Sequence, residues 1–418
     1  MKSLIILGRQ PALGLAELES LYGPDKLKPI EDSAVIVDVD PSLLAFDRLG
    51  GAVKFAKILT ELKTVSWDKI GDFLAQSSLD RSKDLAAGKM HLGISVYGFT
   101  QSPKQVQLLG LKLKRVIRAT GRSVRVASNH EDNLSSAQVI HGHLCGPNGW
   151  ELLLVKAGKQ TVVAQTVKVQ DIEAYTQRDR NRPARDSKVG MLPPKLAQII
   201  INLSASPLPS ETTSSVGNIT PNQLIPNSKS HFNGTLLLDP FCGSGVVLQE
   251  AAIMGYDCLG SDIDQRMTDY AKTNLDWLRS LPRSPLPKEV STEILRADAT
   301  SYIWPRKPTL IASETDLGPP FGSFPSNYQL ETAINNCNKI IRGFLTNIFK
   351  QIDSGTRICL ALPAWQVSQT KLAHLPLLDS IEVIGYNRVS FRHARDEQLI
   401  YRRPGQIVAR ELLVLSKK

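Results

Sequence analysis

One stretch decides the fold: Leu236-Leu237-Leu238-Asp239-Pro240-Phe241-Cys242-Gly243-Ser244-Gly245. Three consecutive leucines indicate a buried strand, and the following glycines predict a tight turn that opens a helix over residues 246–254. From Thr235 onward, strand and helix patterns alternate, which is typical of a parallel sheet with helices on both faces. We therefore expect an α/β domain over residues 235–418.

Two further strands follow the glycine turn, and each leads into an acid. They are Cys258–Asp262 and Glu293–Arg296, the latter followed by Ala297 and Asp298. Because the carboxyl ends of parallel strands meet at one edge of a sheet, Asp239, Asp262 and Asp298 are expected side by side. There Asp239 suits an ammonium group, Asp262 ribose hydroxyls and Asp298 an adenine amine.

These features favour S-adenosylmethionine among nucleoside ligands. A dinucleotide site would carry a third glycine where Val246-Val247-Leu248 stands, and a phosphate loop of the Walker type is absent. The alternatives are a purely structural turn, another nucleotide or a vestigial pocket. The expected cofactor-binding residues are Asp239, Pro240, Phe241, Gly243, Ser244, Gly245, Asp262, Ile263, Asp298 and Ala299.

Length and composition indicate a multidomain protein with a polyanionic partner. A chain of 418 residues exceeds one hydrophobic core, and the net charge of +10 with a pI of about 9.3 favours an acidic partner. The five scattered cysteines lack the spacing of a zinc site, so we expect reduced thiols, a cytoplasmic protein and no metal. No apolar run predicts a membrane span or a signal peptide.

The N-terminal half reads as two small α/β units, over residues 1–65 and 92–165. The first is predicted to contain a helix from Leu43 to Leu49. Residues 204–233 are rich in Ser, Pro, Thr and Asn, and we expect a flexible insertion there.

The motifs resemble those of the THUMP-domain tRNA guanine-N2 methyltransferases. The resemblance rests on residues 239–245 with Gly260–Asp264, on the linker from Gln170 to Ala197 with its Arg-Pro pattern, and on the ending Arg402–Glu411. It covers nearly the whole chain and is weakest over residues 1–90.

The resemblance implies four segments. They are an N-terminal ferredoxin-like domain (1–65), a THUMP RNA-binding domain that grips the tRNA acceptor end (66–170), a linker helix with the flexible insertion (171–234), and a Rossmann-like methyltransferase domain (235–418). The last has a mostly parallel seven-stranded sheet with an antiparallel last strand, for which Ile381–Tyr386 and Glu411–Ser416 are suitable strands.

The loop after the fourth strand departs from the family pattern of an acid or amide, two prolines and an aromatic. Counting from strand Thr309–Ser313 puts Glu314 in the acid position, which we favour. Sliding by four residues instead aligns residues 318–322 and loses the acid. Glu314 or Asp316 would accept the hydrogens of the substrate amine. The candidate catalytic residues are Glu314, Asp316, Gly318, Pro319, Pro320 and Phe321.

Basic residues supply candidate RNA contacts on a helix from Lys104, in the linker and between the last strands. The near-alternate arginines of the linker favour an extended basic strip, although solvated faces are the alternative for each group. The candidates are Lys114, Arg115, Arg118, Arg178, Arg180, Arg182, Arg185, Arg392 and Arg395.

The sequence therefore predicts methyl transfer to an exocyclic base amine of tRNA, with guanine N2 favoured. The alternatives are a DNA amino-methyltransferase and a non-catalytic RNA-binding protein with an altered loop. A monomer is compatible with the sequence.

Overall fold

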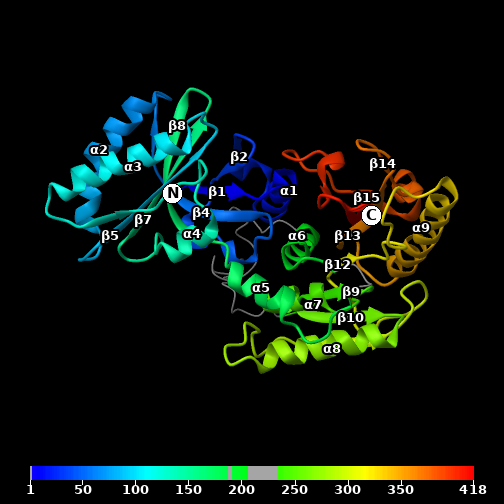
Figure 1. Cartoon of the computed structure of the whole chain (residues 1–418). Helices are drawn as coiled ribbons and strands as arrows, with labels where there is room; N and C mark the ends of the chain where they lie inside the picture. The colour runs from blue at the N-terminus through cyan, green and yellow to red at the C-terminus, as the bar shows by residue number, and fades with distance from the viewer. Residues whose placement is uncertain (1, 187–190, 206–233) are drawn as a thin grey trace, which may run out of the picture. The chain divides into compact units, whose positions relative to one another are not determined.

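The computed structural model describes residues 2–186, 191–205 and 234–418. The described chain forms two compact units, each considered by itself (Figure 1). Unit 1 comprises residues 2–11, 25–46 and 52–174, and unit 2 comprises residues 12–24, 47–51 and the described residues from 175 onward. Of the expected insertion at residues 204–233, residues 206–233 lie outside the described residues, whereas Ser204 ends a helix that begins at Pro194.

Unit 1 is built on one mixed sheet. Within its described residues, eight strands follow the order β2-β3-β1-β4-β8-β7-β5-β6. Residues 1–65 and 66–170 both contribute strands, since β4 pairs antiparallel with β8. The strands are β1 (Ser3–Leu7), β2 (Leu27–Ile30), β3 (Ala34–Val37), β4 (Ala52–Leu62), β5 (Met90–Tyr97), β6 (Val124–Val126), β7 (Gly149–Ala157) and β8 (Gln160–Val169).

Helices α2 (Trp67–Asp84) and α3 (Pro103–Arg118) pack on one face of this sheet. Helix α3 begins at a capping box in which Ser102 and Gln105 satisfy each other's backbone N–H groups. Its buried side consists of Val106, Leu109, Gly110, Leu113 and Ile117. A short helix, α4 (Ser136–His141), follows β6.

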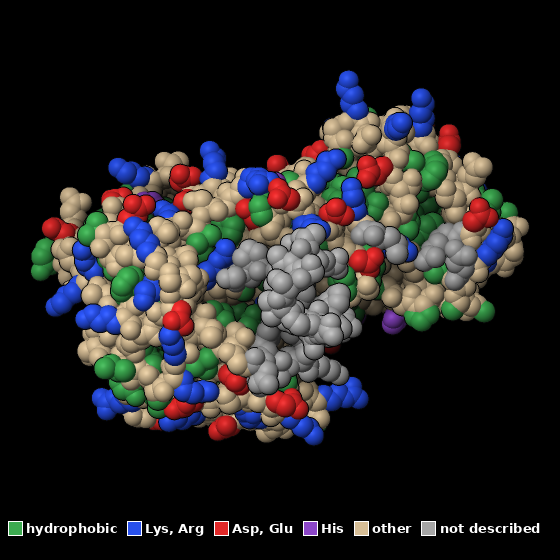
Figure 2. Space-filling view, turned by 180° about the vertical axis from the view of Figure 1, so that it is seen from behind, with side chains coloured by type: hydrophobic (Ala, Val, Ile, Leu, Met, Phe, Trp, Pro, Cys, Tyr) green, Lys and Arg blue, Asp and Glu red, His purple; other side chains and the backbone are tan. Residues whose placement is uncertain are grey.

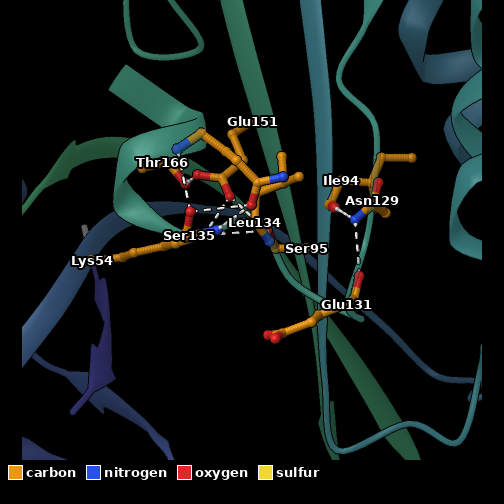
Figure 3. Close-up of polar contacts among 10 residues, drawn as sticks. Lys54, Ile94, Ser95, Asn129, Glu131, Leu134, Ser135, Glu151 and Thr166 are labelled. Carbon is orange, nitrogen blue, oxygen red and sulfur yellow. Dashed lines mark hydrogen bonds and ion pairs between the residues drawn. The ribbon is translucent and has the colours of Figure 1, made fainter. Parts of the chain in front are cut away.

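A buried polar cluster ties together four neighbouring strands of unit 1 (Figure 3). Lys54 of β4 lies 2.5 Å from Oε1 of Glu151 on β7, and Ser95 of β5 donates to the same oxygen at 2.6 Å. Thr166 of β8 donates to Oε2 at 2.6 Å, and the backbone N–H of Leu134 donates to Ser95 Oγ. We call these side chains the Glu151 cluster. Because every carboxylate oxygen has a donor, the charge of Glu151 is accommodated at 0% exposure.

The predicted helix from Leu43 to Leu49 is wrong. The segment forms two 3₁₀ turns, η2 (Pro41–Leu43) and η3 (Phe46–Arg48). The next two backbone N–H groups, of Gly50 and Gly51, donate to the carboxylate of Glu17 instead of to a helical carbonyl. The backbone of Leu44 is extended (φ −85°, ψ 110°) and separates the two turns, so no continuous α-helix forms.

Unit 2 carries a second, mostly parallel sheet. Its described residues give the strand order β11-β10-β9-β12-β13-β17-β15, with β14 beside β13 and β16 beside β17. The first five strands run parallel, and β17 is antiparallel to both of its neighbours β13 and β15. The strands are β9 (Leu236–Asp239), β10 (Asp257–Asp262), β11 (Thr292–Arg296), β12 (Leu310–Glu314), β13 (Arg357–Gln366), β14 (Leu372–Ala373), β15 (Tyr386–Arg388), β16 (Ile400–Tyr401) and β17 (Val408–Lys417).

Both faces of this sheet are covered (Figure 1). Leu237 packs with helices on one face, whereas Leu236 and Leu238 pack with α9 on the other, as the alternation of side chains along a strand requires. The helices of the first face are α1 (Pro11–Tyr22), α6 (Pro194–Ser204), α7 (Val246–Ile253) and α8 (Gln265–Ser280), and that of the second is α9 (Asn327–Phe349). Helix α5 (Ile172–Arg180) leads into unit 2.

The predicted strand Ile381–Tyr386 is wrong over most of its length. Residues Ile381–Ile384 form the short helix α10, and only Tyr386–Arg388 pair as β15. Ile381 and Ile384, three residues apart, both pack against the core, while Val383 is exposed. A spacing of three places both isoleucines on one side of a helical turn, whereas a strand would place them on opposite faces.

Candidate active site

A cavity of about 1340 Å³ lies at the carboxyl edge of the sheet in unit 2. Parallel α/β sheets commonly bind ligands at this edge, because several loops converge there. The linker, the strand ends, α9 and the segment before β17 form the walls. The wall residues used below are Asp239, Gly243, Asp262, Ile263, Asp298, residues 314–321, Asn336, Lys339, Ile340, Gly343 and Arg410.

The glycine turn between β9 and α7 adopts backbone conformations that favour glycine. Gly243 has φ +50° and Gly245 has φ +84°. A Cβ atom at Gly245 would also lie 3.0 Å from Cβ of Ala271, so α8 packs close to the turn. The N–H of Gly243 donates to Oδ2 of Asp262 at 2.9 Å, which links the turn to the end of β10.

Asp239 is a fully buried carboxyl group whose hydrogen-bond donors are uncharged. Ser313 Oγ lies 2.5 Å from Oδ1, and the N–H of Phe241 lies 3.4 Å from it. Burial raises the pKa of Asp239 to about 8, although both hydrogen bonds oppose the shift. A cation arriving beside Asp239 would therefore stabilise a charge that the protein itself leaves poorly compensated.

The other two strand-end acids differ from Asp239. Burial raises the pKa of Asp262, whose Oδ1 accepts from the N–H of Asp264. Asp298 is exposed, and hydrogen bonds from Thr300 lower its pKa. Beside Asp262, the side chain of Ile263 is 64% exposed and lines the cavity, an apolar surface suited to a flat ring.

The loop after β12 brings all six candidate catalytic residues to the cavity wall. Glu314 is the last residue of β12, and the N–H of the next residue, Thr315, donates to the carbonyl oxygen of Ala361 on β13. This bond anchors the beginning of the loop to the sheet. Asp316 is exposed and its Oδ1 accepts from the N–H of Gly318 at 3.0 Å, which closes a local turn. Both alignments of the family pattern thus bring their residues to the same cavity.

Glu314 is held by an arginine that the sequence did not single out. Nε of Arg410 lies 2.5 Å from Oε1 of Glu314, and the two side chains are 6% and 16% exposed. Burial raises the pKa of Glu314, while the charge and hydrogen bond of Arg410 lower it. Arg410 lies inside the ending that carried the family resemblance, and this position was the only signal for it.

Asn274 of α8 was also missed, and it clamps two loops of the site. Its Nδ2 donates to the carbonyl oxygens of Ser244 and Ala184, and its Oδ1 accepts from the N–H of Ala184, each at 2.9 Å. The fully buried amide therefore fixes the glycine turn to the linker. An isolated asparagine in a helical pattern carries no sequence signal for this role.

The prediction of an extended basic strip in the linker is wrong. Helix α5 continues to Arg180, and Arg178 turns inward to pair with Glu250 of α7 at 2.6 Å. Arg182 is 2% exposed, and Arg185 donates to the carbonyl of Arg180. The near-alternate spacing failed as a predictor because helical geometry and burial send these side chains in different directions.

The remaining basic candidates reach the surface to different degrees. On α3, Arg115 and Arg118 are exposed and Lys114 is half-buried, while Arg392 and Arg395 are exposed near β16. Figure 2 shows lysines and arginines interspersed with acidic side chains on the face that it presents, rather than gathered in one stripe.

No group of three or more His, Cys, Asp or Glu side chains suited to a metal ion occurs among the described residues. In the same part of the chain, no helix is both long and apolar enough to cross a bilayer.

Comparison with known sequences points to methyltransferases. Residues 230–280 match the family model of the UPF0020, RMKL-like methyltransferase domain. The chain is 29% identical over 174 residues to the tRNA (guanine(10)-N2)-dimethyltransferase of Methanothermobacter thermautotrophicus, covering 42% of this chain and 39% of that protein. It is 24% identical over 162 residues to the enzyme of the same name from Methanocaldococcus jannaschii, covering 39% and 36%. The chain thus spans about two fifths of the length of these relatives.

Among solved structures, the chain resembles TrmN from Thermus thermophilus. The TM-score is 0.50 at 17% sequence identity, and the alignment covers 100% of both chains. This likeness extends to the fold, and the expected α/β architecture with a Rossmann-like C-terminal domain is confirmed.

Proposed function

We propose that this chain transfers a methyl group from S-adenosylmethionine to an exocyclic amine of a base in tRNA, with guanine N2 as the favoured amine. The observation that carries the proposal is a single cavity lined both by the three strand-end acids and by the loop at residues 314–321. The similarity to tRNA (guanine(10)-N2)-dimethyltransferases supports the choice of substrate.

The residues present fit the cofactor. The poorly compensated carboxyl of Asp239 suits its ammonium group, Asp262 its ribose hydroxyls, Asp298 its adenine amine and Ile263 the face of its adenine. Gly243 lines the cavity and leaves room for close approach of a ligand to the backbone, whereas Gly245 lets α8 pack close to the turn. When bound, the cofactor would supply an electrophilic methyl group on a sulfonium.

The loop at residues 314–321 would hold the substrate amine. A carboxylate of Glu314 or Asp316 accepts an amine N–H, which directs the nitrogen lone pair toward the methyl group. Transfer would form the nitrogen–carbon bond with loss of the carbon–sulfur bond, and Glu314, Asp316 or water would then take up the one proton that the nitrogen releases. Positioning matters more here than base strength, because the proton leaves after attack.

Unit 1 would choose the RNA. The family resemblance implies that residues 66–170 grip the tRNA acceptor end, and the exposed Arg115 and Arg118 of α3 are suitable phosphate contacts. Since a base inside a helix is out of reach, the target nucleotide must leave its stack to enter the cavity.

The test is transfer of labelled methyl groups from S-adenosylmethionine to unmodified bulk tRNA, followed by nucleoside analysis. We expect label in N2-methylated guanosine and a loss of label in Glu314→Gln or Asp316→Asn. Whichever variant loses more activity identifies the acid of the motif. Asp276→Asn, an exposed acid of α8, is the matched control and should retain activity.

Two outcomes contradict the proposal. Label in DNA but not in tRNA would favour the DNA amino-methyltransferase. Binding of cofactor and tRNA without any label would favour a non-catalytic RNA-binding protein.

A further inference from the structure

We propose that Phe324 and Tyr328 form an aromatic platform beside the cavity, on which an unpaired RNA base next to the methylated nucleotide stacks. This inference rests on the proposed function and deepens it by naming where the flanking RNA strand lies. Lys339, about three turns farther along α9, supplies positive charge for the strand's phosphates.

The rings of Phe324 and Tyr328 are unusually exposed. Phe324 is 52% and Tyr328 is 79% exposed. Among the described phenylalanine, tyrosine and tryptophan residues, the only other exposed side chain is that of Phe73 of α2, at 37%. Two of these three exposed rings therefore lie within five residues of one another, and the remaining described side chains of these three types are buried or half-buried.

Both rings lie directly after the loop that lines the cavity. Residues 314–321 line the cavity, Phe324 follows three residues later, and Tyr328 is the second residue of α9. A capping box between Ser326 and Gln329 fixes the start of α9, so Tyr328 stands on a defined helical turn. The platform thus directly continues the loop that would hold the substrate amine.

Helix α9 connects Tyr328 to the cavity along one of its faces. Four residues of this helix, Asn336, Lys339, Ile340 and Gly343, line the cavity. Tyr328 precedes Lys339 by eleven residues, which in an α-helix is about three turns, roughly 16 Å, with an angular offset of only about 20°. Tyr328 and the exposed Lys339 therefore share one helix face, which leads from the platform into the cavity.

The chemistry of the occupant follows from these features. Removing a base from its stack leaves its neighbour without a partner on one side, and exposed aromatic rings are the usual surfaces that receive such bases. Exposed rings and a lysine farther along the same helix face suit a single strand, which presents both bases and phosphates along its length. An apolar protein segment would carry no negative charge to pair with Lys339 on this helix face.

The experiment measures RNA binding separately from methyl transfer, with the full-length chain. The probes are unmodified bulk tRNA and a short single-stranded RNA carrying 2-aminopurine, whose fluorescence falls when it stacks on an aromatic ring. The variants are Phe324→Ala, Tyr328→Ala and the double change. Tyr328→Phe keeps the ring, and Val383→Ala removes an apolar side chain that is 82% exposed on α10, outside the cavity wall.

We expect wild type to quench 2-aminopurine and the double variant to lose the quenching. The KM for tRNA should rise roughly 5- to 100-fold, the range for loss of a stacked base. Binding of S-adenosylhomocysteine should stay unchanged, and both controls should behave as wild type.

Unchanged quenching and RNA affinity in the double variant would overturn the platform, as would a change confined to self-association of the chain. Quenching without methyl transfer would support the platform while the proposed function failed.

Discussion

The carboxylate of Glu314 and the guanidinium of Arg410 form an ion pair across strand β13, with 2.5 Å between Oε1 and Nε. Glu314 is opposite Ala361 of β13, and Arg410 is opposite Pro363 of the same strand. Two residues on strands that do not pair directly therefore meet above the strand between them. The pair lies in the cavity wall, where it sets both the direction and the charge of the Glu314 carboxylate.

Arg410→Gln should lower methyl transfer at neutral pH by roughly 10- to 100-fold, the loss expected for one charge-assisted hydrogen bond. Burial alone raises the pKa of Glu314 and Arg410 lowers it, so without Arg410 the carboxyl stays protonated to higher pH. The acid limb of the pH–rate profile should then move to higher pH, with activity partly recovered in alkaline buffer. The measurement is the rate from pH 6 to 9.

Arg410→Lys should keep more activity than Arg410→Gln, because it retains the charge. Arg388→Gln breaks a different Arg–carboxylate pair, with Asp396, and should leave the profile unchanged. If Arg410→Gln reduces the rate equally at every pH, Arg410 does not act through the ionisation of Glu314.

The sequence predicts features that depend on neighbouring residues, and it does not predict features that depend on residues far apart in the chain. The run from Leu236 to Gly245 predicts its own strand, turn and helix, and alternation of elements predicts that three strand-end acids share one edge. Arg410 meets Glu314 across 96 residues only because β17 inserts antiparallel beside β13. No local sequence pattern predicts that Glu314 and Arg410 form a pair.

In the linker, a local pattern predicts a surface that the folded chain does not form. Its arginines match a basic strip in spacing, yet the orientation of Arg178 is decided by Glu250, a residue on a distant helix. Likewise the segment from Leu43 to Leu49 has a helical pattern, yet Leu44 adopts an extended backbone and divides the segment into two 3₁₀ turns.

Asp239→Asn should weaken cofactor binding by at least about tenfold while leaving the ligand-free protein as stable or more stable. The raised pKa of Asp239, about 8, means that the protein disfavours its charge, and asparagine removes that charge while keeping an acceptor for Ser313. Thermal unfolding at pH 8.5 with and without S-adenosylhomocysteine measures both effects. An undiminished ligand-induced rise in Tm would argue against an ammonium contact at Asp239.

The Glu151 cluster should tolerate joint replacement better than the loss of one partner. Lys54→Met leaves a carboxylate at 0% exposure without its cation and should lower the free energy of unfolding by about 3–5 kcal/mol. Lys54→Met with Glu151→Leu should recover much of that loss, since no unpaired charge remains. Urea denaturation measures the difference.

Lys112→Met is the control for the Glu151 cluster, because it breaks an exposed pair with Asp72 and should change stability by less than about 1 kcal/mol. A double variant no more stable than Lys54→Met alone would show that packing, rather than charge pairing, dominates at this position.

Glu17 should make stability fall as the pH rises from about 4.5 to 7. Burial raises its folded-state pKa from the ordinary 4.5 to about 7, despite hydrogen bonds from Asn202 and from the N–H groups of Gly50 and Gly51. Between these two values the folded state holds a proton that the unfolded chain has lost, so stability falls with pH by about 3 kcal/mol and levels off above pH 7. Glu17→Gln cannot ionise, so its free energy of unfolding relative to wild type should improve by about that amount from pH 4.5 to pH 8. Urea denaturation across this range measures it, and a difference that stays constant with pH would mean that Glu17 does not titrate in this window.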